Sequence, residues 1–219
     1  WKLPRFGSLE EEAKKYLNDE VKNVEEAIAG ALDIIAEIIA DHPRNRQFVK
    51  QIFYHQGMLV TKEKKKHEDE DKVYEMYYDY HERVNRIVSH RILAINRAEN
   101  EKVITVNIVL DKEFLIQYIN RGVTRNRNSS VNEYLLKAVE DSLNRLLLPS
   151  IEREVRSELT EKASEQALKV FSINLEKLLM QAPLKDKMVL GLDPAYRTGC
   201  KLAVVDQTGK VLKIDKVFI

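Results

Sequence analysis

The chain of 219 residues carries 36 Lys and Arg against 35 Asp and Glu, a formal net charge of +1, with 44% hydrophobic and 32% charged residues. This composition supplies enough apolar material for a packed core. It excludes global disorder and a uniformly basic surface that would bind nucleic acid, but it does not exclude a local basic face. The single cysteine, Cys200, excludes an intrachain disulfide framework and is typical of a reducing compartment.

Helical signals dominate the first part of the chain. Ser8 with Glu11, and Asn23 with Glu26, have the spacing of helix N-terminal caps. Apolar residues at three- and four-residue steps over 24–39 predict a wide helical stripe that packs on more than one neighbour.

The next segments alternate between helix and loop signals. Pro43 suits the first turn of a helix that runs to about residue 56 and ends at Gly57. Residues 62–72, a basic block followed by an acidic one, predict a solvated loop. Residues 74–97 are helical in composition, whereas 102–110 is β-branched and partly alternating and predicts a strand.

The remainder of the chain changes from helix to strand. Helices are expected over 112–120 and 130–148, followed by a kink or new first turn at Pro149 and a long helix to about residue 181. Short apolar runs then predict three strands, near 188–193, 201–206 and 210–218.

The predicted fold class is therefore α+β and predominantly α-helical. We expect a helical region over 1–185, with one short strand near 102–110, and a second domain that begins in 186–219. The chain lacks an initiator Met and a signal-peptide pattern and stops on a strand, so both ends look cut, and we expect a piece of a longer protein. No run approaches the about 18 apolar residues of a membrane helix, and no membrane partner is expected.

Asp193 stands at the end of the first of these late strands, before Pro194 and near Arg197. A hairpin there could hold a phosphate, or a divalent cation through the Asp193 carboxylate. Asp-Pro after a strand is also a common start of a turn, so a turn with a purely structural role remains an alternative interpretation.

Long ordered segments of the chain resemble the bacterial Tex proteins, which are transcription accessory proteins. Residues 191–212 (GLDPAYRTGCKLAVVDQTGKVL) resemble the start of the YqgF-type, RNase H-like domain of this family. The upstream segments that resemble the Tex central helical region and the long helices before that domain are 25–41, 77–101, 138–159 and 162–184. Ala98 and Ala195 stand where the family usually has Gly, and Val88 where it has Pro.

The resemblance implies nucleic-acid binding, of RNA or DNA, and a role in transcription, with no settled enzymatic activity. It also implies that 186–219 forms the first three antiparallel strands of an RNase H-like domain. Because such nucleases need several carboxylates around their metal ions, Asp193 is a candidate ligand only in a complete domain, and we expect no catalysis, resident metal or cofactor in this piece. The alternatives are a metal-dependent nuclease or resolvase whose other carboxylates lie beyond Ile219 and, less favoured, an actin-like nucleotide-binding hairpin.

The candidate phosphate contacts are basic side chains in three segments. A helix over 83–97 would bring residues 83, 86, 90 and 97 near one face, although these cations could instead pair with acids at 68–71 or 140–141. The candidates are Arg83, Arg86, His90, Arg91 and Arg97, then Arg121, Arg125 and Arg127, then Arg197 and Lys201.

Other residues weigh against further chemistry. The tyrosines at 74, 77, 78 and 80 could stack on bases, but their spacing favours packing with the hydroxyls at the rim. The five histidines are never three or four residues apart, which argues against zinc. We further expect weak nucleic-acid affinity, a cytoplasmic location, possible contact with the transcription machinery, and a possible homodimer through an exposed sheet edge.

Overall fold

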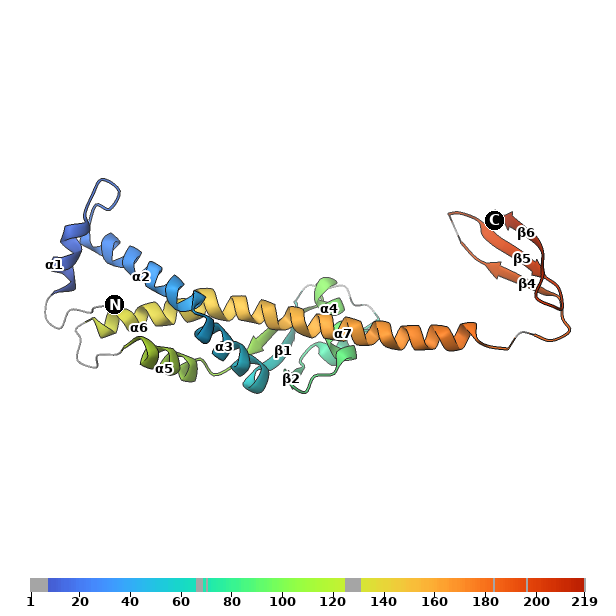
Figure 1. Ribbon diagram of the computed structural model, residues 1–219, viewed down its shortest axis with the longest axis horizontal. Helices are drawn as coiled ribbons and strands as arrows, with labels where there is room; N and C mark the ends of the chain where they lie inside the picture. The colour runs from blue at the N-terminus through green and yellow to red at the C-terminus, as the bar shows by residue number, and fades with distance from the viewer. Residues whose placement is uncertain are drawn as a thin grey trace. The chain divides into compact units, whose positions relative to one another are not determined.

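The computed structural model describes residues 8–65, 69, 71–124, 131–182, 184–195 and 197–218. The chain divides into two compact units, Trp1–Ala167 and Leu168–Ile219. Helices dominate, and two small antiparallel sheets of three strands each accompany them (Figure 1). The predicted fold class is confirmed.

The first helices begin where the sequence places their caps. Helix α1 spans Leu9–Ala13, α2 spans Val24–Asp41 and α3 spans Pro43–Gln56. The Asn23 side chain accepts a hydrogen bond from the Glu26 amide at 2.8 Å, so this predicted cap is confirmed, whereas Ser8 makes no side-chain cap bond.

Helix α2 packs on α3, on α6 (Asn132–Asp141) and on the π-helical segment Ser142–Leu147. Its stripe is only partly covered: Ala36, Ile39 and Ala40 are buried, but Ile34 and Ile38 are 60% and 48% exposed.

The first sheet holds a strand pair that the sequence analysis did not predict. Strands β1 (Met58–Glu63), β2 (His81–Arg83) and β3 (Ile104–Val109) pair antiparallel in the order β2-β1-β3. The predicted helix over 74–97 is wrong, because only a 3₁₀ turn at Glu75–Tyr77 and helix α4 (Ser89–Asn100) are helical there.

Contacts to β1 explain why residues 77–83 are not helical. Buried Thr61 donates its hydroxyl to the Tyr77 carbonyl at 2.5 Å, and the Tyr80 carbonyl accepts from the Thr61 amide at 2.9 Å. The backbone groups of this segment are therefore satisfied by β1 rather than by a helix. Tertiary pairing has overridden local helix propensity.

The later helices of the first unit run continuously past the predicted break. Helix α5 spans Lys112–Val123, and α6 continues through the π-helical segment into α7, Leu148–Leu179. The wider π turn lies immediately before Pro149, whose ring would clash with an α-helical carbonyl four residues earlier. The core joins α3, α4, α5, β3 and the start of α7, and its largest fully buried side chains include Phe53, Ile95, Ile104, Leu115, Ile119, Leu143, Leu147 and Ile151.

The second unit contains the end of α7, from Leu168, and a three-stranded meander. Its strands are β4 (Val189–Asp193), β5 (Cys200–Val205) and β6 (Val211–Val217), paired antiparallel in that order. These strands agree with the prediction, and Cys200 is buried where β5 begins. The part of the chain that the structure describes holds no helix long and apolar enough to cross a membrane.

Candidate nucleic-acid interface

The basic residues predicted to share one helix face do not share a helix. Arg83 ends β2, Arg86 lies in the following turn and His90 lies in the first turn of α4. The Arg83 carbonyl accepts from the Arg86 amide at 2.9 Å, so the chain reverses tightly between strand and helix. All three side chains are exposed, and no carboxylate among the described residues forms an ion pair with them. We call these three residues the β2–α4 patch.

Arg91 and Arg97 are occupied by carboxylates. Arg91 bonds Glu82 at 3.0 Å, and the Tyr80 hydroxyl bonds the same carboxylate. Arg97 bonds Glu101 at 2.9 Å. These two arginines therefore pair with carboxylates, which the sequence analysis gave as the alternative to phosphate contact. Their partners are Glu82 and Glu101 and not the acids at 68–71 or 140–141.

Electrostatics supports the strength of the Arg91 contact. Burial raises the pKa of Glu82, but hydrogen bonds from Tyr80 and Arg91 outweigh it and hold that pKa below its ordinary value. Burial, followed by the bond to Glu82, raises the pKa of Tyr80 to about 12. Arg91 thus stabilises β2 beside α4 and is less available to phosphate than Arg83 or Arg86.

The tyrosine cluster is packed, as its spacing favoured, but not on a helix. Tyr74 and Tyr77 are buried, and the Tyr74 hydroxyl donates to Glu101. Tyr78 donates to Asp69 at 2.8 Å, a bond that with burial raises the pKa of Tyr78 to about 12. These rings support the loop before β2 and are not presented for stacking on bases.

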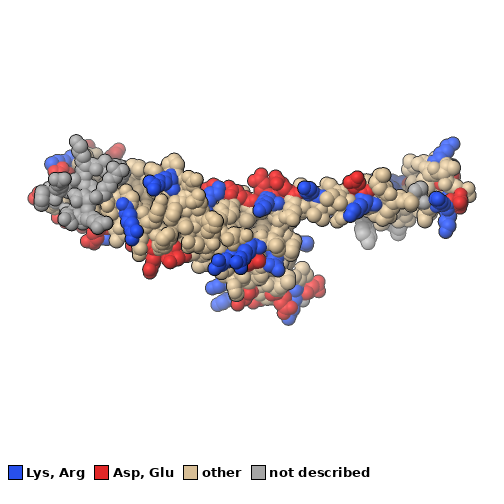
Figure 2. Space-filling model, turned by 60° about the horizontal axis from the view of Figure 1, so that its bottom comes forward, with Lys and Arg blue, Asp and Glu red and all other residues tan. Residues whose placement is uncertain are grey.

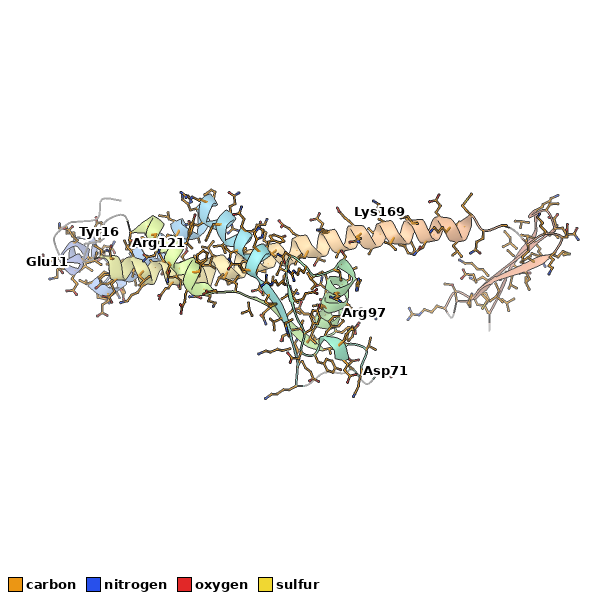
Figure 3. All side chains as sticks on the ribbon, turned by 90° about the horizontal axis from the view of Figure 1, so that it is seen from below. Glu11, Tyr16, Asp71, Arg97, Arg121 and Lys169 are labelled. Atoms are coloured by element: carbon orange, nitrogen blue, oxygen red, sulfur yellow. The ribbon has the colours of Figure 1, made fainter. Side chains whose placement is uncertain are left out.

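Arg121 lies in the last turn of α5, in a separate region of the first unit from Arg97 (Figure 3). It lines a cleft of about 690 Å³, which we call the α2–α5 cleft. The other lining residues are Ile38, Ile39, His42, Arg44, Asn45, Tyr118, Ile119, Gly122, Val123 and Leu135. Arg125 and Arg127, predicted to continue this basic segment, lie outside the described residues.

His42 and Arg44 were missed by the sequence analysis. They lie at the start of α3, far along the chain from Arg121, and only the fold brings the two arginines and the imidazole to one cleft. The sequence did contain one signal for these residues. Acidic side chains are favoured at a helix N-terminus and basic ones are not, yet the first turn of α3 contains Arg44 and no acidic residue.

In the second unit, Asp193 ends β4 and lies opposite Lys201 in the β4–β5 register. Both side chains are exposed, as is Arg197 in the connecting loop. Asp206 lies at the other end of β5, where its carboxylate accepts from the Thr208 amide at 2.8 Å and the Lys210 amide at 2.9 Å. No group of three or more His, Cys, Asp or Glu side chains suited to a metal ion occurs within the described residues.

The charges on the visible face are of mixed sign (Figure 2). On the face that Figure 2 presents, Lys and Arg alternate with Asp and Glu among the coloured residues. A contact with phosphate on this face would therefore be local, through a few cations that form no ion pair with a described carboxylate.

Comparison with protein families assigns nearly the whole chain. A family model described as Tex central region-like matches residues 7–171, and one described as Tex protein YqgF-like domain matches residues 187–219. The chain belongs to the Tex family. The order of the two Tex segments is the order of helical region and β4–β6 meander along the chain.

Individual Tex relatives match along almost the full chain. The uncharacterized protein YdcI of Bacillus subtilis (strain 168) is 48% identical over 219 residues, 99% of this chain and 30% of the relative. The transcriptional accessory protein Tex of Neisseria gonorrhoeae is 31% identical, covering 96% of this chain and 28% of the relative. The human S1 RNA-binding domain-containing protein 1 is 29% identical, covering 93% of this chain and 22% of the relative. The chain thus spans less than a third of the length of these relatives.

The departures from the Tex pattern are accommodated. In the β4–β5 loop, φ is positive at Gly199 (+78°) and not at Ala195, so alanine there meets no left-handed strain. Ala98 is fully buried inside α4, and Val88 precedes α4 in extended conformation, where a Pro constraint is not needed.

Proposed function

We propose that this chain is the nucleic-acid-binding scaffold segment of a Tex transcription accessory protein, and that it contacts phosphate oxygens through the β2–α4 patch. The observation that carries the proposal is that Arg83 and Arg86 are exposed and free of ion pairs to the described carboxylates, whereas Arg91 and Arg97 are engaged. The names of two relatives, one a transcriptional accessory protein and one with an S1 RNA-binding domain, support this class of function.

The chemistry of the patch suits backbone contact rather than base recognition. A guanidinium offers a planar fork of donors to phosphate, and such contacts position a nucleic acid without specifying its sequence. Two or three cations release few counterions, so affinity should be weak and should fall steeply with salt. Arg197 and Lys201 are proposed as a further contact from the second unit, weakened by Asp193 opposite Lys201.

Fluorescence anisotropy with single- and double-stranded RNA and DNA oligonucleotides tests the proposal. We expect the double variant R83A/R86A to bind more weakly than the wild type at about 50 mM salt, and both to lose most binding at about 200 mM. The matched control is K169A/K177A, which removes the same charge from exposed positions on α7. Equal binding by R83A/R86A and the wild type, or nanomolar binding that barely responds to salt, contradicts the proposal.

Further assignments of domains, location and partners go with this proposal. Residues 1–185 act as the helical region and 186–219 as the start of the YqgF-like domain, in the cytoplasm where transcription takes place. The exposed edge of β6 is a site for pairing with a second copy or with further strands. Sedimentation of the chain at rising concentration tests for the homodimer, and copurification with RNA polymerase tests contact with the transcription machinery.

The alternative activity is metal-dependent nuclease action by a longer protein. It is favoured by one observation, the exposed Asp193 carboxylate at the end of the first strand of the meander. Magnesium-dependent cleavage of oligonucleotides by the full-length protein, lost in D193N, supports it. Absence of cleavage by the full-length protein leaves Asp193 with a structural role.

A further inference from the structure

The α2–α5 cleft has an apolar floor. Residues at the ends of α2, α3 and α5 and in α6 line it. Helices α2 and α5 both pack on α6 (Figure 1). Ile39, Ile119 and Leu135 are almost completely buried beneath it, and Tyr118 and Val123 are half-buried at its sides. Such a concave, mainly aliphatic site is the kind of surface that accepts an apolar side chain.

The floor continues outward along α2. Ile34 and Ile38 are four residues apart, so they lie on one face of the helix, and they are 60% and 48% exposed. Ile38 belongs both to this exposed face and to the lining of the cleft. An apolar track therefore leads from the surface of α2 into the cleft, long enough for two anchors one helical turn apart.

The polar part of the cleft is entirely cationic or neutral. His42, Arg44 and Arg121 line it together with Asn45, and no carboxylate of the described chain is among the lining residues. Arg44 and Arg121 are exposed, and neither forms an ion pair with a described carboxylate.

The wall of the cleft is also preformed. The Asn45 side chain donates to the Ile39 carbonyl at 2.9 Å, which ties the start of α3 to the end of α2. A preformed cleft spares an incoming ligand the cost of ordering it.

We infer that the α2–α5 cleft is a docking site for an acidic, amphipathic peptide segment of a partner protein. Apolar side chains one turn apart would occupy the cleft and the Ile34–Ile38 face, and flanking Asp or Glu would pair with Arg44 and Arg121. Charge complementarity selects this occupant, because a rim of arginines around an aliphatic floor matches carboxylates around aliphatic anchors.

A nucleic acid fits this cleft less well. Bases are held by stacking on aromatic rings and by hydrogen bonds to their edges, and the floor is aliphatic. Of the two aromatic rings among the lining residues, Tyr118 already stacks on Phe48 with a centroid separation of 3.6 Å, and the His42 imidazole accepts a hydrogen bond from the Arg44 amide at 3.2 Å. The inference goes beyond nucleic-acid binding and does not depend on the β2–α4 patch.

Selection from a random-peptide phage library on the immobilised chain tests the inference. We expect enriched peptides to carry two large apolar residues at a spacing of three or four, flanked by Asp or Glu. A synthetic copy of an enriched peptide should bind R44E/R121E at least about tenfold more weakly than it binds the wild type, as measured by anisotropy. It should also lose affinity to I38S, because that change removes an anchor contact.

The matched control is R83E/R86E, which reverses the same charge at the β2–α4 patch and should bind the selected peptide as the wild type does. Circular dichroism spectra and melting temperatures that agree among the variants show that each is folded. Enrichment of basic or uncharged sequences, no enrichment above an empty surface, or equal peptide binding by R44E/R121E overturns the inference. Single-stranded RNA that binds wild type but not R44E/R121E, and displaces the peptide, assigns the cleft to nucleic acid instead.

Discussion

Replacing Lys50 by Met tests the ion pairs that join α3 to α7. The Lys50 ammonium lies 2.7 Å from Glu154 and 2.5 Å from Glu158, and the three side chains are 28% to 42% exposed. Met retains most of the apolar stem of Lys, so the change mainly removes charge and hydrogen bonds.

The magnitude follows from what remains after the substitution. Arg46 still bonds Glu154 at 3.2 Å, and the Tyr54 hydroxyl still donates to Glu158 at 2.7 Å, so neither carboxylate is left unpaired. Two half-exposed ion pairs of short length are worth about 0.5–1 kcal/mol each. We therefore expect K50M to lower the free energy of unfolding by about 1–2 kcal/mol in urea denaturation near neutral pH.

The loss should depend on pH in a fixed direction. The bonds from Lys50 lower the pKa of Glu154 and of Glu158 below their ordinary value of 4.5. A carboxyl whose folded pKa is lowered contributes stability above its unfolded pKa, and that contribution is lost as pH falls through the folded pKa. The difference in free energy of unfolding between wild type and K50M should thus have its full size near neutral pH and shrink as the pH falls below 4.5, the ordinary pKa of these carboxyl groups.

The control is K169M, on an exposed part of α7 with no ion pair to a described residue, which should change stability by less than about 0.5 kcal/mol. No loss in K50M near neutral pH refutes the reasoning. So does a loss that keeps its size in acid, because it would then come from packing rather than from charge.

Other substitutions test single features of the fold. G199A should weaken β5–β6 pairing by at least about 1–2 kcal/mol in amide exchange, since φ is +78° and a Cβ would lie 3.0 Å from the Phe218 ring. G209A, with φ of +86° but open space around its Cβ, should cost less, and an equal cost would mean that the contact is unimportant. N23A should cost about 1 kcal/mol in urea denaturation through loss of the α2 cap, and no change contradicts the cap. Hydrogen bonds within its turn lower the pKa of Asp206 below 3.8, so amide protection of this hairpin should fall as pH falls through that lowered pKa, and D206N should abolish the pH dependence.

The late strands could be predicted because their signals are local. Residues 188–218 combine apolar runs with a Gly-containing turn, and positive φ at Gly199 and Gly209 lies at the two connections. The order of neighbouring antiparallel strands then follows from short loops. Nothing beyond sequence neighbours is needed to obtain this meander.

The first sheet could not be predicted in the same way. Strand β1 ends in charged residues, and β2 is only three residues long, so neither carries a clear period of two. Residues 74–97 have helical composition, and the bonds of the segment before α4 to β1, among them those from Thr61, decide against a helix there.

The same limit applies to the candidate site. The sequence identified Arg83, Arg86 and His90 as basic, but their exposure and the pairing of Arg91 with Glu82 depend on where β2 lies. The cationic rim of the α2–α5 cleft joins segments that are remote in sequence, so no local pattern predicts it.

The central claim is that this Tex chain holds nucleic acid through the phosphate contacts of the β2–α4 patch. The most direct measurement is the slope of log affinity for an oligonucleotide against log salt concentration, for the wild type and for R83A/R86A. Each phosphate contact contributes about one unit to this slope, so the double variant should have a slope shallower by about two. Identical slopes would contradict the claim, since the bound phosphates would then lie elsewhere on the chain.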